Sequence, residues 1–415
     1  MTSRAVALCA DLPSLEFRLA LRLEGLPLAC REALEARWPE AMSGASHPAE
    51  RSRIRLVLEA SGEGVGLPSS ALVTVELAWR SARRAVLRTN GAELELEVGD
   101  GEIQGQGWLD GARSRGAVDA VVRAVTTLAL MREKVLLLHA AAVEVDGEGV
   151  VLLGRSGAGK TTTARRLGRE GMRRLSDDMI AVDLSREPPR LHRLPFERAG
   201  RARVDASDQG VPCRGGAWVN KGATALGAER HGDPVRGWVE SVIALPPAPS
   251  EAHSVLDAVG RLRALPLWVL EVPPAGALSS GVRRWMDGLR EGARIPLDGP
   301  LVSLQARAAG GTEGGAPESM GEQEQMQRVE RSPNVAWRIL DGVAVLVVPS
   351  SPAIQTLNEV GSLVWQLADG RSLDAIVDAV VREFEVEEAQ ARADVEHFVS
   401  ELEGLGMLRR VPETR

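Results

Sequence analysis

The middle of the chain contains the stretch that decides its fold, VVLLGRSGAGKTTTARRLGR at residues 150–169. Residues 150–153 are apolar and have the length of a buried strand, while residues 162–169 are expected to form a helix. Residues 154–161 match the P-loop pattern GxxxxGK[ST], which is specific when a strand precedes it and a helix follows. The stretch therefore predicts an α/β fold with an anion-binding loop at the end of a strand.

This loop has the residue types that binding of nucleotide phosphates requires. Glycines let backbone N–H groups turn inward around an anion, and the following helix points its positive N-terminal end at the same place. Lys160 is expected to reach the β- and γ-phosphates, and the Thr161 hydroxyl is a hard ligand for Mg²⁺. We therefore predict ATP and Mg²⁺ as cofactors. The predicted nucleotide-binding residues are Gly154, Ser156, Gly157, Ala158, Gly159, Lys160, Thr161 and Thr162.

Two acidic residues and one histidine lie near the P-loop in the sequence. Asp177 and Asp178 follow the loop closely, and we expect them at the edge of the strand next to the P-loop strand. One such carboxylate can coordinate Mg²⁺ while the other accepts a proton from an attacking hydroxyl, and a surface turn is the alternative. His139 lies in the apolar run 135–145, expected to be a strand antiparallel to the one that feeds the loop. Taken alone, His139 is better explained as a structural histidine, because a lone histidine on a strand more often has that role.

These three features occur in the order of a known kinase family. His139, the loop 154–161 and the segment 174–178, which is Arg-Leu-Ser-Asp-Asp, resemble the catalytic core of the HPr serine kinase/phosphorylase family. That core is related to ATP-dependent phosphoenolpyruvate carboxykinase. The resemblance implies an α/β (α+β) P-loop kinase core of the HPr kinase type. It also implies that Lys160 and His139 are catalytic, that Asp178 accepts the proton of the substrate hydroxyl, and that Thr161 and Asp177 hold the metal.

The chain also departs from this family. Its downstream Gly-rich signature, second acidic metal ligand and late catalytic arginine loop are not recognisable, and Glu197 is one candidate for the missing ligand. Reverse, phosphate-removing activity and HPr as the substrate are therefore not implied.

Composition divides the chain into four parts. Residues 1–134 predict an α+β scaffold with strands near 53–60, 71–79 and 92–98 and a helix at 115–134, without chemistry of its own. Residues 135–304 predict the nucleotide-binding core, in which 238–245 and 267–272 are expected to be strands. Residues 305–332 are rich in Gly and poor in large apolar residues, which predicts a flexible linker. Residues 333–411 predict a compact tail domain.

The tail has the pattern of a winged-helix-like α+β domain with three strands and three helices. The strands are expected at 335–340, 343–348 and 353–357, and the helices at 359–368, 373–383 and 387–405. Nucleic acid is an unsuitable partner, because residues 333–411 hold 6 Arg, no Lys and 13 Asp and Glu.

The tail resembles the PQQ synthesis protein D family in three places. These are Leu357-Asn358-Glu359, Ala368-Asp369-Gly370, and Asp394-Val395-x-x-Phe398-Val399-x-x-Leu402, followed by Gly406-Met407-Leu408. Such domains recognise the leader segments of ribosomally made peptides, and the leader adds as a strand to the sheet edge beside the last helix. The peptide-binding residues implied by the resemblance are Ala353, Ile354, Gln355, Thr356, Leu357, Val395 and Phe398.

The combined prediction is a kinase that phosphorylates a Ser or Thr hydroxyl of a precursor peptide, which the tail holds through a flexible tether. Two other functions stay open: a peptide chaperone or switch that hydrolyses ATP, and a small-molecule kinase whose tail serves assembly, including homo-oligomer formation. The net charge of −7 and the absence of a long apolar run argue against nucleic acid and membrane as partners. The three cysteines have no metal-ligand spacing, and a reducing cytoplasm is the expected location. Lysine is rare: only Lys134, Lys160 and Lys221 occur among 50 basic residues, so each retained lysine is informative.

Overall fold

The computed structural model describes most of the chain. The described residues are 6–12, 17–24, 54–61, 75–89, 91–110, 114–194, 210–223, 226–248, 250–291, 327–333, 335–348 and 354–412. Glu197, Ala353 and the linker residues 305–326 lie outside them.

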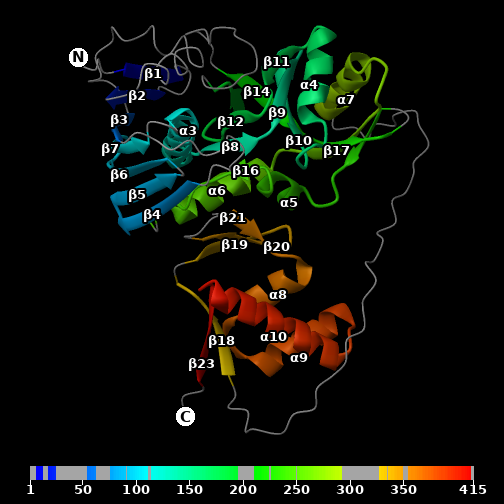
Figure 1. Cartoon of the computed structure of the whole chain (residues 1–415). Helices are drawn as coiled ribbons and strands as arrows, with labels where there is room; N and C mark the ends of the chain where they lie inside the picture. The colour runs from blue at the N-terminus through cyan, green and yellow to red at the C-terminus, as the bar shows by residue number, and fades with distance from the viewer. Residues whose placement is uncertain are drawn as a thin grey trace.

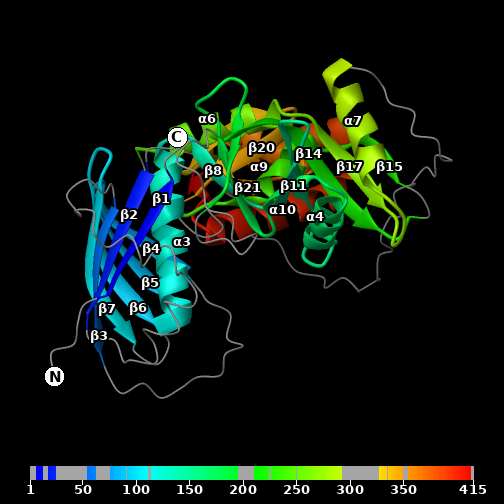
Figure 2. The same cartoon turned by 90° about the horizontal axis from the view of Figure 1, so that it is seen from above.

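The N-terminal part is a seven-stranded sheet with one long helix on one face. The strand order is β1-β2-β3-β7-β6-β5-β4, and Figure 2 shows helix α3 (Ser114–Arg132) lying along the sheet. The apolar side of α3 packs on alternate residues of the strands, such as Leu56 and Leu94, and also on Val135 and Leu137 of the next strand. This helix therefore joins the N-terminal sheet to the core. The strands are β1 (Val6–Leu12), β2 (Phe17–Glu24), β3 (Ile54–Ser61), β4 (Val75–Ser81), β5 (Arg84–Thr89), β6 (Ala92–Val98) and β7 (Ile103–Asp110).

The core is a ten-stranded mixed sheet covered by helices on both faces (Figure 1). Helices α4 (Lys160–Arg169) and α7 (Ser279–Glu291) belong to one apolar cluster, and α5 (Pro234–Val239) and α6 (Ala252–Arg263) belong to another. Strands β10, β14 and β17 run parallel and side by side, so their carboxyl ends form one edge. Ligands bind at such edges in α/β proteins. The strands are β8 (Val135–His139), β9 (Ala141–Val145), β10 (Glu148–Leu153), β11 (Arg173–Ser176), β12 (Met179–Asp183), β13 (Arg190–His192), β14 (Val211–Lys221), β15 (Gly227–Arg230), β16 (Val242–Ile243) and β17 (Leu267–Val272).

The structure corrects three predictions in the core. The run 135–145 is two strands that separate at Ala140: β9 pairs with β10, whereas β8 pairs with β12 and β16. Strand β11 pairs with β9 and not with the P-loop strand, so the acidic pair lies in the turn between β11 and β12. Residues 238–245 are not one strand, because helix α5 ends at Val239. Asp233 caps this helix by accepting from the Arg236 N–H, and Pro234 opens it.

The three strands and three helices that were predicted for the tail are present in it. Strands β19 (Ala336–Leu340), β20 (Val343–Val347) and β21 (Ile354–Thr356) form one sheet in that order. Helices α8 (Glu359–Leu367), α9 (Leu373–Phe384) and α10 (Glu388–Gly404) follow, with Asn358 and Ser372 as N-caps of the first two.

A second sheet in the tail was not predicted. It consists of β22 (Asp369–Ser372), β18 (Gln327–Arg331) and β23 (Leu408–Pro412), in the order β22-β18-β23. The prediction that residues 305–332 are linker is therefore wrong for 327–331, which pair with the last strand from Gln327↔Pro412 to Arg331↔Leu408. The tail domain begins at residue 327.

The tail packs against the core through the β19-β20-β21 sheet, as Figure 1 shows beside α6. On one face of this sheet Leu340, Val345 and Ile354 share an apolar cluster with α5 and α6. Residues of the opposite face, including Leu346, pack on the tail's own helices. Two ion pairs of 2.7 Å, Arg338–Asp257 and Arg263–Asp341, flank the contact. The expectation of a freely tethered tail is therefore replaced by a docked tail.

Candidate active site

The P-loop joins the carboxyl end of β10 to the first turn of α4. Gly159 is the N-cap residue of α4 and has a φ of 104°, and Gly154 has a φ of 137°. Only glycine adopts such angles without strain. Lys160 is 7% exposed, and its Nζ donates to the carbonyl oxygens of Gly154 at 2.7 Å and Arg155 at 3.3 Å. The lysine is thus held inside the curve of the loop.

His139 and Asp178 lie together beside this loop. Strand pairing places His139 opposite Met179, so Asp178 is the next residue towards the loop edge. His139 Nδ1 is 3.4 Å from Asp178 Oδ1, and Arg123 Nη1 from helix α3 is 3.7 Å from Asp178 Oδ2. The three side chains come from helix α3, strand β8 and the turn between β11 and β12, and half of the Asp178 side chain is exposed.

Electrostatic interactions connect this group to the P-loop lysine. Burial, then the positive charge of Lys160, lower the pKa of His139 from its ordinary value, and Asp178 opposes the shift. Burial lowers the pKa of Lys160, and Asp178 again opposes the shift. His139 is therefore neutral at neutral pH, and Asp178 faces both groups.

Asp177 has a different environment, although it is adjacent to Asp178 in the chain. Its residue is 7% exposed, and its carboxylate oxygens lie 3.3 Å from Arg174 and 3.4 Å from Arg165. The Thr161 hydroxyl donates to the Asp177 backbone carbonyl at 2.9 Å. A hydroxyl that donates one hydrogen bond keeps its oxygen lone pairs, so Thr161 fits the predicted role of metal ligand. A metal at Asp177 would therefore compete with these two arginines for its carboxylate oxygens.

A cavity of about 660 Å³ opens on the other flank of the P-loop. It lies between the loop, the carboxyl end of β14 and helix α5. The Lys221 side chain lies across Gly159: a Cβ added to this glycine would be 2.8 Å from Lys221 Cε. The lining residues are Arg155, Ser156, Gly157, Ala158, Trp218, Val219, Asn220, Lys221, His231, Arg236, Gly237 and Glu240.

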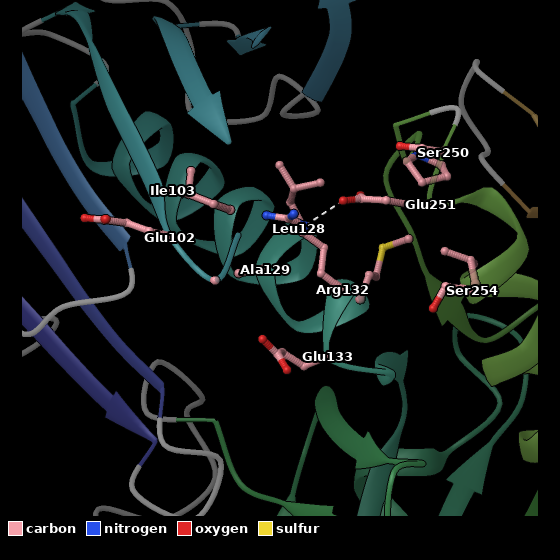
Figure 3. Close-up of a pocket in the computed structure, with 13 residues that line it drawn as sticks. Glu102, Ile103, Leu128, Ala129, Arg132, Glu133, Ser250, Glu251 and Ser254 are labelled. Carbon is pink, nitrogen blue, oxygen red and sulfur yellow. Dashed lines mark hydrogen bonds and ion pairs between the residues drawn. The ribbon is translucent and has the colours of Figure 1, made fainter. Parts of the chain in front are cut away.

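A second cavity, of about 260 Å³, lies between β7, α3 and α6 (Figure 3). Arg132 in this cavity pairs with Glu251 at 2.7 Å and donates to the carbonyl of Gly99 at 2.7 Å, and Glu102 pairs with Arg55. None of the residues that line it belongs to the P-loop or to the His139–Asp178 group. This cavity is a junction between the scaffold and the core.

The structure describes all of the predicted peptide-binding residues except Ala353. Strand β21 is the edge strand, and Leu357 N–H donates to Ala344, so the N–H groups of Leu357 and Gln355 face β20. The N–H groups of Ile354 and Thr356 consequently face the open edge. Phe398 of α10 is half-buried and lies against Gly361.

Val395 does not belong to the predicted peptide groove. Its side chain is 1% exposed and lies in the core of the tail, because it is on the inner face of α10. The prediction that it contacts the peptide is therefore wrong.

Several residues of the site were not predicted. The scaffold was expected to carry no chemistry, yet it supplies Arg123, and only the tertiary packing of α3 on β8 reveals this. Lys221 had a sequence signal in the rarity of lysine. Burial raises the pKa of Cys213 on β14 to about 12, so its thiol stays protonated and is not a nucleophile.

Two further observations concern only the described ranges. None of the helices there is both long and apolar enough to cross a membrane. Within the same residues, no three His, Cys, Asp or Glu side chains gather into a group that could hold a metal ion.

Comparisons with known proteins cover separate parts of the chain. The family model described as Coenzyme PQQ synthesis protein D (PqqD) matches residues 344–408. The tail is a PqqD domain. The model described as SynChlorMet cassette protein ScmC matches residues 117–195, the segment that holds Arg123, His139, the P-loop and Asp178. Neither match covers half of the chain, and neither tests the resemblance to HPr kinase, which stays a prediction.

Other comparisons add little. Curated proteins give no match. One similar solved structure is "TbiB1 in Complex with the TbiA(beta) Leader Peptide", which is 27% identical and covers 19% of this chain and 94% of that chain, with a TM-score of 0.18.

Proposed function

We propose that this protein is an ATP-dependent kinase that phosphorylates a Ser or Thr hydroxyl of a ribosomally made precursor peptide, recruited by its PqqD domain. The observation that carries the proposal is the grouping of Asp178 and His139 beside Lys160 at the end of the P-loop strand. A base next to a bound γ-phosphate is what phosphoryl transfer to a hydroxyl requires.

In the proposed reaction the acceptor hydroxyl oxygen bonds to the γ-phosphorus while the bond from that phosphorus to the β-bridging oxygen breaks. Asp178 takes the hydroxyl proton, and ADP carries away the electron pair of the broken bond. Lys160 balances the charge on the transferring group, and neutral His139 orients Asp178 through the 3.4 Å contact. Mg²⁺, bound by phosphate oxygens and Thr161, would supply further neutralisation of phosphate charge.

The PqqD domain supports peptide as the acceptor. Its edge strand β21 directs the N–H groups of Ile354 and Thr356 outward, which is the arrangement that strand addition of a leader needs. The peptide downstream of a bound leader has a raised effective concentration at the site.

The test is incubation with γ-labelled ATP and the precursor peptide encoded nearest the gene. We expect label on the peptide, loss of labelling in Lys160→Ala, and weaker peptide binding in Thr356→Pro, because proline removes an outward N–H. Thr356→Val is the matched control, since it keeps that N–H. Release of labelled phosphate without transfer would favour an ATP-hydrolysing switch. Labelling that does not depend on the leader and is unchanged in Thr356→Pro would favour a small-molecule kinase.

A further inference from the structure

We propose that the cavity beside the P-loop seats the nucleoside and inner phosphates of the nucleotide, with Lys221 as a second cationic contact to the phosphate chain. The inference rests on the proposed function, because it specifies how the ATP of that kinase lies.

The P-loop strand β10 has a different neighbour on each side, so the P-loop that follows it has two distinct flanks. At the carboxyl end of β10, Leu152 pairs with Ala141 on one side and Leu153 pairs with Trp218 on the other. The first side leads back to His139 and Asp178, and the second leads on to Lys221. Because the lining of the cavity includes neither His139 nor Asp178, the cavity lies on the flank away from the proposed base.

The size and chemistry of this flank suit a nucleotide. A volume of about 660 Å³ is within the range of small-molecule sites, roughly 300–1,000 Å³. Trp218 and His231 lie edge to face at 5.6 Å and give the cavity an aromatic wall. Burial lowers the pKa of His231, with Asp233 and Glu240 opposing, so this wall is uncharged at neutral pH.

The positively charged side chains of the cavity differ in whether a carboxylate pairs with them. Arg236 is paired with Glu240 at 2.8 Å. Among the described residues, no ion pair joins Arg155 or Lys221 to a carboxylate, and both are exposed at the loop. An anion in the cavity would therefore meet two available positive charges next to the backbone N–H groups of residues 155–157.

The Lys221 side chain lies against the last turn of the loop. Its carbon chain crosses Gly159, where a Cβ would approach Cε to 2.8 Å and Cγ to 3.3 Å. Lys160 lies one residue further, inside the loop. Both lysines therefore lie at the last turn of the P-loop, where a bound phosphate chain can meet two positive charges.

The experiment measures binding of ADP and of pyrophosphate to the full-length protein with Mg²⁺ by calorimetry. Lys221→Met keeps the length and packing of the side chain and removes its charge. We expect it to weaken both ligands about tenfold, as for loss of a charge-assisted contact, and Lys221→Arg to restore most of the affinity. Trp218→Leu should weaken ADP alone, because pyrophosphate has no nucleoside. Arg169→Ala removes an exposed charge from the last turn of α4 and should change neither.

The outcomes separate this inference from the proposed function. If the wild-type protein binds neither ADP nor pyrophosphate, both fail. If it binds them and Lys160→Ala does not, while Lys221→Met stays within twofold of wild type, the inference is wrong and the kinase proposal stands. If Lys221→Met and Trp218→Leu change only the KM for peptide, the cavity holds the acceptor and not the nucleotide.

Discussion

Asp177 and Asp178 are adjacent carboxylates with different surroundings, so replacing each by asparagine should separate an effect on stability from an effect on catalysis. Asp177 has a side chain that is 9% exposed and pairs with Arg165 and Arg174. Asp178 has a side chain that is 52% exposed and faces His139 and Arg123. The substitution changes charge and hardly changes shape.

The exposure of the partners determines the expected loss of stability. Arg165 and Arg174 are 57% and 29% exposed, so water screens both pairs and each is worth far less than a fully buried pair. We expect Asp177→Asn to lower the free energy of unfolding by about 1–2 kcal/mol, a fall in Tm of about 2–8 °C. Asp178→Asn should cost under about 0.5 kcal/mol. Loss of a general base should lower kcat by about 10²–10⁴-fold in Asp178→Asn.

Thermal denaturation and transfer of labelled phosphate measure these two effects on the same preparations. Asp177→Asn should lower Tm and leave kcat within a few-fold of wild type. The reasoning is refuted if Asp177→Asn melts as the wild type does but needs far more Mg²⁺ for transfer. That result would make Asp177 the metal ligand that the kinase resemblance implies.

Three other predictions follow from contacts described above. The pKa of His139 is lowered in the folded protein, so below pH 6.5 the unfolded chain takes up the proton first. The contribution of neutral His139 to the free energy of unfolding is therefore full above pH 6.5 and is lost as the pH falls below that value. Thermal melts of wild type and His139→Asn across pH should diverge only on the acid side. Arg123→Ala should lower kcat and leave the Kd for ADP unchanged, because the Arg123 guanidinium faces Asp178 and does not line the P-loop cavity. Weaker binding of ADP to this variant in calorimetry would contradict the prediction. Leu340→Ala in the contact between tail and core should cost about 2–4 kcal/mol, and scanning calorimetry should show one transition moved down; two separate transitions in the wild type would contradict docking.

Local patterns explain what could be predicted. The P-loop carries its strand, turn and helix within one short segment, and the caps at Asn358 and Ser372 mark the tail helices. Residues 135–145 are apolar except for His139 and Glu144 and lack Gly or Pro, so no turn signal marks the change of partner at Ala140. The continuous apolar run of strand β20 does indicate in the sequence that both faces of this strand are buried. The sequence does not show that α6 covers the second face.

Arg123 and Arg165 could not be found from the sequence, because the packing of α3 and α4 brings them to Asp178 and Asp177. Arg174 is different, since it lies only three residues before Asp177 in the segment 174–178. Asp233 and Pro234 did provide a helix-start signal in the sequence. This signal outweighs the strand-like composition of the residues that follow it.

Helix α5 has six residues, lies beside β21 of the PqqD domain, and contributes Arg236 and Gly237 to the cavity at the P-loop. A leader added at β21 and a nucleotide in that cavity would share this short wall. Thermodynamic linkage then fixes a relation between them: the factor by which a leader changes the Kd for nucleotide equals the factor by which nucleotide changes the Kd for leader. One coupling free energy, measured in either direction, would then describe how strongly the two proposed sites influence each other.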